Sequence, residues 1–260
     1  MALSAPRTGA AGDGEEPDDP GRMTLVEHLA ELRNRLIKAL LAVVIGGAVG
    51  FALYDPVLDQ LVDPYCQILK EQAPDRACRL VITDPLESFS IRLKLSAYLG
   101  LLFASPVVLW QLWRFITPGL YSKEKRYAVP FVLSSVLLFA LGAFLALVTF
   151  PRTLDFLSAF AGENTEAFYT PGKYLGLLTF MMLAFGVGFE FPVVLVALQA
   201  AGILHWRRLA SWRRYAIVVI FVVDAVITPS GDPVTLCALA VPMYLFYEVA
   251  ILIGRFVLRR

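Results

Sequence analysis

One carboxylate stands in a run of apolar residues, where a charge is costly. Glu190 lies in the stretch AFGVGFEFPVVLV (184–196), and the nearest other charges along the chain are Lys173 and Arg207. A charged side chain at the centre of a membrane helix costs about 2.5–3.5 kcal/mol on insertion scales, and residues kept there usually have a function. A carboxyl group at that depth can carry a proton or hold one strong hydrogen bond. Glu190 is therefore the first candidate functional residue, with a purely structural, hydrogen-bonded glutamic acid as the alternative.

The rest of the chain offers little for catalysis or metal binding. It has two histidines and three cysteines, and it contains no CxxC, HExxH, GxSxG or GxxxxGK[ST] motif. An intramembrane protease would need a serine–histidine pair or two aspartates at membrane depth. Only Asp224 lies at that depth, and His28 and His205 fall at the membrane edge. We therefore expect no enzyme activity, no metal site and no cofactor.

The composition indicates an integral membrane protein. Of the 260 residues, 58% are hydrophobic and only 17% are charged, and the mean hydropathy is +0.66. A spanning helix needs roughly 20 mostly apolar residues. Six candidate spans fall at about 36–54, 86–110, 128–150, 174–200, 215–228 and 234–254. The fifth is short and reaches only about 21 Å, against about 30 Å of hydrocarbon.

The distribution of basic residues orients these spans. With the N-terminus in the cytoplasm, most Lys and Arg residues fall on the cytoplasmic side, including those of WRRLASWRR (206–214). The positive-inside rule then favours cytoplasmic positions for both termini. We expect an all-α, six-span domain over 23–256. A disordered cytoplasmic tail rich in Gly, Pro, Asp and Glu precedes it at 1–22, and a cytoplasmic C-terminus follows at 257–260.

The first outer loop, 55–85, has apolar residues at helical spacing. They are Leu58, Leu61, Val62, Tyr65 and Leu69. This pattern predicts an amphipathic helix that caps the outer face of the bundle. Cys66 and Cys78 both fall in this loop, on the oxidising side of the predicted topology. A disulfide between them and a pair of free thiols are both open alternatives.

Four stretches of the chain match a known family in order and in register with the predicted spans. They are MTLVEHLAELRNRL (23–36), SPVVLWQLWRFITPGLYSKEKR (105–126), AFGVGFEFPV (184–193), and TPSGDP (228–233) followed by AVPMYLFYE (240–248). Together they closely resemble the TatC family, the signal-peptide receptors of twin-arginine protein translocases. The resemblance runs from about residue 23 to about 256. It implies a glove-shaped bundle of six helices with a concave face, in the cytoplasmic membrane of a prokaryote.

The resemblance also implies a function and its partners. The cargo would be folded proteins whose signal peptides carry two adjacent arginines. The partners would be the single-span proteins TatA and TatB, in a multi-copy complex within the lipid bilayer. The driving force would be the proton-motive force, which agrees with the missing nucleotide motif.

Matched positions assign residues to the signal-peptide site. HLAELR places Glu31 and Arg33 at the cytoplasmic start of the first span, and LYSKEKR places Glu124 in the first cytoplasmic loop. Phe115 would line the same site. The chemistry agrees, because a carboxylate can grip the planar guanidinium fork of arginine at two points, which lysine cannot match. Glu31 could instead form only an i,i+4 ion pair with Arg35.

Further positions match or depart from the family pattern. Glu190 matches the glutamate that faces the concave side, and Pro64 and Asp232 match positions in the outer cap and the last turn. Pro64 could serve only to shape the cap, and Asp232 only to cap the last helix. Asp224 in the fifth span and Arg92 in the second are charges that the family does not predict.

A proton-coupled secondary transporter is the alternative function. It would use the intramembrane carboxyl groups of Glu190 and Asp224 as proton carriers. Such transporters usually have broken helices with polar groups at mid-membrane and paired structural repeats. No internal repeat is visible in the sequence, and the spans contain few polar groups. The translocase receptor is therefore the favoured hypothesis.

Overall fold

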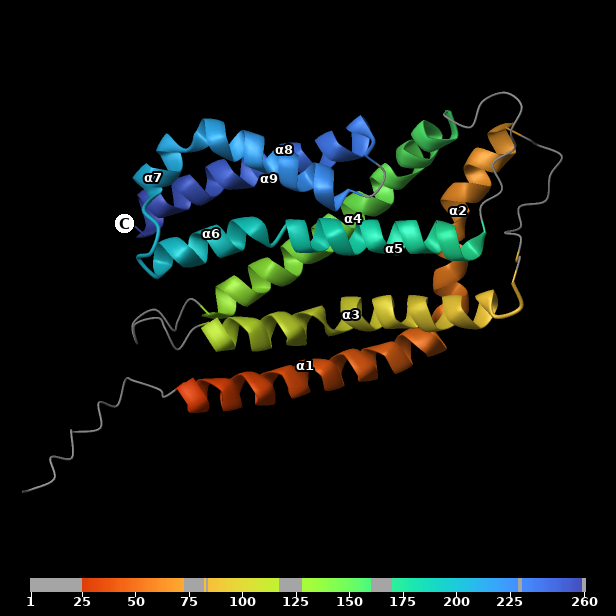
Figure 1. Ribbon diagram of the computed structural model, residues 1–260, viewed down its shortest axis with the longest axis horizontal. Coiled ribbons are helices and arrows are strands. Elements are labelled where there is room, and N and C mark those ends of the chain that lie inside the picture. The colour runs from red at the N-terminus through yellow and green to blue at the C-terminus, as the bar shows by residue number, and fades with distance from the viewer. Residues whose placement is uncertain are drawn as a thin grey trace, which may run out of the picture.

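The computed structural model describes residues 25–72, 82, 84–116, 128–159, 170–228 and 231–258. Within these ranges the secondary structure is helical, without a β-strand. The helices are α1 (Leu25–Ala52), α2 (Tyr54–Gln72), α3 (Glu87–Ile116), α4 (Ala128–Ala159), α5 (Pro171–Gly188), α6 (Phe191–Ala200), α7 (Trp206–Ser211), α8 (Arg213–Ile227), α9 (Pro233–Ile253) and the π-helical turn η3 (Gly254–Leu258) (Figure 1). The all-α class predicted from the sequence is confirmed.

Five helical segments among the described residues are long and apolar enough to cross a membrane. They are His28–Ala52, Glu87–Phe115, Val129–Ala159, Pro171–Ala200 and Pro233–Leu258. The remaining predicted span, the fifth at 215–228, is α8, whose 15 residues reach only about 22 Å, as its short sequence predicts. The helices also run past the predicted ends: α1 begins at Leu25 rather than 36, and α4 ends at Ala159 rather than 150. Hydropathy marks only the apolar part of a helix, while backbone hydrogen bonding continues beyond it.

Figure 1 shows how the helices are arranged. The start of α1 and the end of η3 lie at the same end of the bundle, which we name the terminal end; α2 lies at the opposite end. Helices α1 and α3 pack side by side, and α8 packs on α9. Helices α5 and α6 follow one line through the middle of the view, and α4 crosses obliquely to contact α3, α5 and α9.

Helix α2 confirms the helix predicted in the first outer loop. Leu61, on its apolar face, is buried in the main core. The hydroxyl of Tyr174 in α5 donates a hydrogen bond to the Leu61 carbonyl oxygen at 2.9 Å. Helix α2 is therefore attached to the bundle by its apolar face and by one buried polar contact.

The fourth predicted span is broken at the candidate residue Glu190. Helix α5 ends at Gly188 and α6 begins at Phe191, with Phe189 and Glu190 in a turn between them. Pro192 has no backbone N–H, so it cannot complete the i to i−4 bond to the Gly188 carbonyl. The regular pattern resumes where the Val194 N–H bonds to the Glu190 carbonyl oxygen at 3.1 Å. The proline therefore explains the break that holds the glutamate.

Glycines bring the backbones of α1 and α3 into contact. A Cβ atom added at Gly46 would lie 2.7 Å from the Gly100 carbonyl oxygen, and one added at Gly100 would lie 2.6 Å from the Gly47 nitrogen. Gly50 approaches the Ser96 carbonyl in the same way. Gly46 and Gly50 thus form a GxxxG pattern, which allows close van der Waals packing where water provides no hydrophobic driving force between helices.

Candidate functional site

A polar pocket opens between α1 and α3 at the terminal end of the bundle. Its volume is about 370 Å³. Its described lining consists of Ala30, Glu31, Asn34, Arg35 and Lys38 from α1 and Gln111 and Arg114 from α3. We name it the α1–α3 pocket. Its position depends on the two helices that the glycine contacts hold together, so their separation sets the width of the pocket.

Glu31 is the single carboxylate in the described lining of this pocket. Its Oε1 atom accepts a hydrogen bond from Arg35 Nε at 3.0 Å, and the Arg35 Nη2 atom bonds to the same oxygen. The predicted i,i+4 ion pair is therefore confirmed. The second carboxylate oxygen, Oε2, is buried and has no hydrogen-bond partner among the described residues. One face of the carboxylate is thus used, and the other remains able to accept a donor.

The described lining of the α1–α3 pocket includes none of the other residues predicted for the signal-peptide site. Arg33 is exposed, and the described lining of the α1–α3 pocket does not include it. Phe115 stacks on His28 with ring centroids 4.5 Å apart, which joins the end of α3 to the start of α1. Glu124 lies outside the described residues, in the segment that follows Ile116. The structure therefore brings Phe115 near the start of α1, but it does not bring Arg33 into the pocket.

A second polar site lies inside the bundle, around Glu190. The Ser135 side chain of α4 is a polar neighbour of the Glu190 carboxyl group, and Val193, one helical turn after Glu190, packs in a buried cluster with Trp113 and Phe139. The Ser135 oxygen accepts a hydrogen bond from the Trp113 indole Nε1 of α3 at 2.9 Å. One carboxyl oxygen of Glu190, Oε1, is buried without a partner within the described ranges. The sequence identified the glutamate, but it gave no indication of Ser135 or Trp113, since both belong to other helices.

An apolar groove runs beside this site. Its volume is about 240 Å³, and its lining comes from α2, α3, α4 and α5. Leu95, Leu99, Phe139, Ala143 and Leu183 are among the lining residues. Phe139 lies one helical turn along α4 from Ser135, so the groove ends about one turn from the Glu190 site. The described lining does not include Glu190 itself.

Asp232 caps a helix, as the sequence predicts. The Asp232 Oδ1 atom accepts a hydrogen bond from the Thr235 N–H at 2.6 Å, so the predicted N-cap of α9 is confirmed. Pro64 lies within α2. Cys66 is disulfide-bonded and Cys237 is a free thiol. Cys78 lies outside the described residues, so its pairing with Cys66 stays a prediction.

The unexpected charge Arg92 is held at the α2 end of the bundle. Its Nη2 atom donates to Asp55 Oδ2 at 3.3 Å. Its guanidinium lies 4.8 Å and 4.7 Å from the ring centroids of Phe51 and Tyr54. Burial raises the pKa of Tyr54, and the positive charge of Arg92 opposes that effect. Arg92 therefore joins α3 to the α1–α2 corner through a cation–π and ion-pair cluster.

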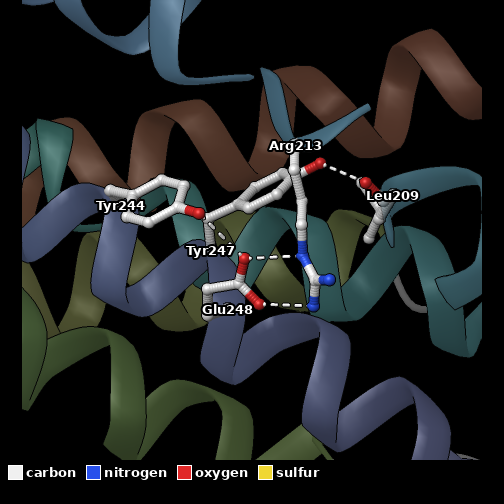
Figure 2. A network of polar contacts seen from close by, with 5 residues as sticks. All are labelled: Leu209, Arg213, Tyr244, Tyr247 and Glu248. Carbon is white, nitrogen blue, oxygen red and sulfur yellow. Dashed lines mark hydrogen bonds and ion pairs between the residues drawn. The ribbon is translucent and has the colours of Figure 1, made fainter. Parts of the chain in front are cut away.

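A polar network that the sequence analysis missed joins α8 to α9 near the terminal end (Figure 2). Arg213 donates to both oxygens of Glu248, at 2.7 Å and 2.8 Å. The Tyr244 hydroxyl bonds to the same carboxylate at 3.1 Å, and the Tyr247 hydroxyl donates to the Leu209 carbonyl at 2.7 Å. The bidentate ion pair therefore fixes the start of α8 against the last turns of α9, and Tyr247 attaches α7 to the same turns.

The other unexpected charge, Asp224, faces the protein interior from α8. Its side chain is fully buried, and neither carboxyl oxygen has a hydrogen-bond partner among the described residues. Its backbone carbonyl accepts bonds from the Thr228 N–H and from the Thr228 hydroxyl. No group of three or more His, Cys, Asp and Glu residues able to hold a metal occurs in the described ranges.

The fold and these sites define a multi-pass α-helical membrane protein whose main polar features are a pocket at one end and a carboxyl group at a helix break. The chain belongs to the TatC family, because residues 27–242 match the family model for the Sec-independent protein translocase protein TatC. The family resemblance inferred from the four sequence stretches is thereby confirmed.

Named relatives and solved structures agree with this assignment. The chain is 43% identical over 242 residues to the Sec-independent protein translocase protein TatC of Frankia casuarinae, covering 91% of this chain and 66% of that protein. It is 39% identical to the TatC protein of Aquifex aeolicus, covering 92% of this chain and 97% of the relative. A crystal structure of the twin-arginine translocase receptor TatC in DDM matches with a TM-score of 0.72 and 38% identity, over 88% of this chain and 99% of that one.

Proposed function

We propose that this chain is the signal-peptide receptor of a twin-arginine translocase. It binds the twin-arginine signal peptides of folded proteins at the terminal end of the bundle, which faces the cytoplasm of a prokaryotic cell. It then assembles in several copies with TatA and TatB, and the proton-motive force drives export. In this function the chain is a binding component of the plasma membrane and catalyses no reaction of its own.

The unpartnered oxygen of Glu31 in the α1–α3 pocket is the observation that carries this proposal. One carboxylate oxygen is occupied by Arg35, and the buried Oε2 atom has no partner within the described part of the chain. A buried acceptor without a donor costs about 1–3 kcal/mol, which an arriving donor can recover. An arginine of the signal peptide supplies up to five N–H donors in a fixed plane, and a lysine supplies a compact point charge.

The charge of the described lining explains why a second carboxylate is needed. The single described carboxylate, Glu31, is already paired with Arg35, and Lys38 adds a further positive charge to the described lining. Such a pocket repels a pair of arginines unless further negative charge is present. Glu124 follows Ile116 by eight residues, a stretch that spans up to about 27 Å when extended. We propose that Glu124 provides this second carboxylate.

The apolar groove and Glu190 supply the intramembrane part of the receptor. The groove, lined by residues such as Leu99 and Phe139, has the chemistry to accept an apolar helix from a signal peptide or from TatA or TatB. Glu190 lies beyond its edge, at a level where one hydrogen bond can fix the register of two apolar helices. The proton-coupled transporter remains the alternative, because the helix break at Glu190 is a feature of such proteins, but the sequence shows no internal repeat to accompany it.

Binding of two synthetic signal peptides tests the proposal. One peptide carries the Arg-Arg pair and its twin carries Lys-Lys, and each is titrated against the full chain in detergent. We expect a preference for Arg-Arg that is lost in Glu31→Gln and in Glu124→Ala. Asp155→Asn is the matched control, because Asp155 is an exposed carboxylate on α4, outside the pocket. Equal binding of both peptides by the wild-type chain, alone and co-expressed with TatA and TatB, would refute the proposal.

A further inference from the structure

Two neighbouring serines of α4 have different hydrogen-bond partners. Ser134 is exposed, and its hydroxyl donates to the Pro130 carbonyl of its own helix at 2.8 Å, the usual arrangement for a helical serine. Ser135 is fully buried, accepts a hydrogen bond from Trp113 of α3, and lies beside Glu190 at the α5–α6 break. Ser135 is thus the contact point of three separate segments.

The donors and acceptors of this group fix the direction of each hydrogen bond. An indole N–H can only donate, so the Trp113 Nε1 atom at 2.9 Å uses a lone pair of the Ser135 oxygen. The serine hydroxyl carries a single proton, which this contact leaves available to the neighbouring Glu190 carboxyl group. The order is therefore indole to hydroxyl to carboxyl, and each group depends on the previous one for its orientation.

Trp113 is itself held firmly. It is 5% exposed, and its ring stacks on Phe131 with centroids 5.1 Å apart. Gln111 and Arg114, on either side of Trp113 in α3, line the α1–α3 pocket. The last turns of α3 therefore present one face to the pocket and direct the Trp113 indole toward Ser135 of α4, since successive helical residues are spaced about 100° apart.

We propose that Ser135 is a positioning residue for Glu190 and that Trp113 orients the Ser135 hydroxyl toward it. Glu190 is then held in one orientation at the helix break, with its Oε1 atom left for an incoming donor. The proposal rests on the proposed receptor function for its effect on export, but the geometry of the three groups does not depend on that function.

Substitution of the two serines separates positioning from general packing. Ser135→Ala removes only the hydroxyl, and Ser134→Ala is the control on the adjacent residue. We expect Ser135→Ala to lower the export rate of a twin-arginine reporter about tenfold, the effect of losing one hydrogen bond to a carboxyl group. Ser134→Ala should leave the rate unchanged. Trp113→Phe keeps an aromatic ring against Phe131 but removes the indole donor, and it should act in the same direction as Ser135→Ala.

Two further measurements identify Glu190 as the group through which Ser135 acts. In a Glu190→Ala background, Ser135→Ala should cause no additional loss of export, because coupled residues are non-additive. In infrared spectra of the purified chain, the carboxyl band that disappears in Glu190→Gln should shift in Ser135→Ala and stay in place in Ser134→Ala.

Each outcome decides the proposal. A full additional loss in the Glu190→Ala background, or an unshifted carboxyl band in Ser135→Ala, would overturn it. A shifted band together with a chain that does not distinguish Arg-Arg from Lys-Lys peptides would keep the positioning role and refute the receptor function. The infrared measurement therefore separates failure of one proposal from failure of the other.

Discussion

The packing of α1 on α3 predicts opposite effects for alanine at two adjacent glycines. At Gly46 an added Cβ would lie 2.7 Å from the Gly100 carbonyl oxygen, with the Gly100 Cα atom at 3.2 Å. These neighbours are backbone atoms, which cannot rotate away. At Gly47 the nearest atom to an added Cβ is the Ser96 carbonyl oxygen at 3.6 Å, an ordinary contact. We therefore expect Gly46→Ala to separate the two helices and Gly47→Ala to fit.

The size of the effect follows from these distances. An ordinary contact needs about 3.5 Å, so Gly46→Ala must move α1 from α3 by about 0.8 Å, which forfeits a quarter to a half of the dispersion energy across the affected contacts. Overpacking of this kind costs about 1–3 kcal/mol. Both substitutions gain the same helix propensity of about 1 kcal/mol, which cancels in the comparison. The two variants should thus differ by about 1–3 kcal/mol, or on the order of 5 °C in Tm.

Thermal unfolding of both variants in one detergent, followed by tryptophan fluorescence, measures this difference. Gly176→Ala serves as a second control, because nothing lies within 4 Å of an added Cβ at that position in α5. We expect Gly46→Ala to melt below wild type and the two other variants to melt at or above it. A Tm for Gly46→Ala equal to that of Gly47→Ala would show that the α1 and α3 backbones are not in contact, and the reasoning would fail.

Three further stability predictions can be checked in the same assay. Asp224→Ala should raise the Tm, because it removes a buried carboxyl group without described partners that costs about 1–3 kcal/mol; a lower Tm would contradict this. Gly254→Ala should lower the Tm, because its Cβ would overlap the buried Gln199 side-chain oxygen, and an unchanged Tm would mean that Gln199 can move aside. Arg213→Gln should remove the ion pair with Glu248, so its Tm should depend less on salt than that of wild type; equal salt dependence would count against the ion pair.

Hydropathy and residue spacing were enough to predict the structural elements that depend only on residues close together in the sequence. The six spans, the amphipathic α2 and the N-cap of α9 each depend on residues that are close in sequence. Glu190 could also be identified, because its charge contrasts with its apolar neighbours. The break at that residue was not predicted, although Pro192 two positions later is the local signal for it.

The contacts around Glu190 could not be predicted from the sequence. Ser135 and Trp113 lie on two other helices, and hydropathy says which segments span but not which faces meet. The ion pair between Arg213 and Glu248, in contrast, could have been predicted from the sequence, because α8 and α9 form a tight hairpin. Arg213 precedes Thr228 by 15 residues and Glu248 follows Pro233 by 15, so the hairpin places both at the same depth.

Because α1 packs mainly on α3, the order of synthesis determines when its interface can form. Helix α1 packs mainly on α3 and lightly on α2, so most of its interface exists once residue 116 has been added to the chain. The α1–α3 pair can therefore assemble in the bilayer while α4 to α9 are still being translated, because contacts between nearby segments form before distant ones. The two helices that line the α1–α3 pocket would then be the first to pack together. The later helices would pack on this pair and complete the groove and the Glu190 site.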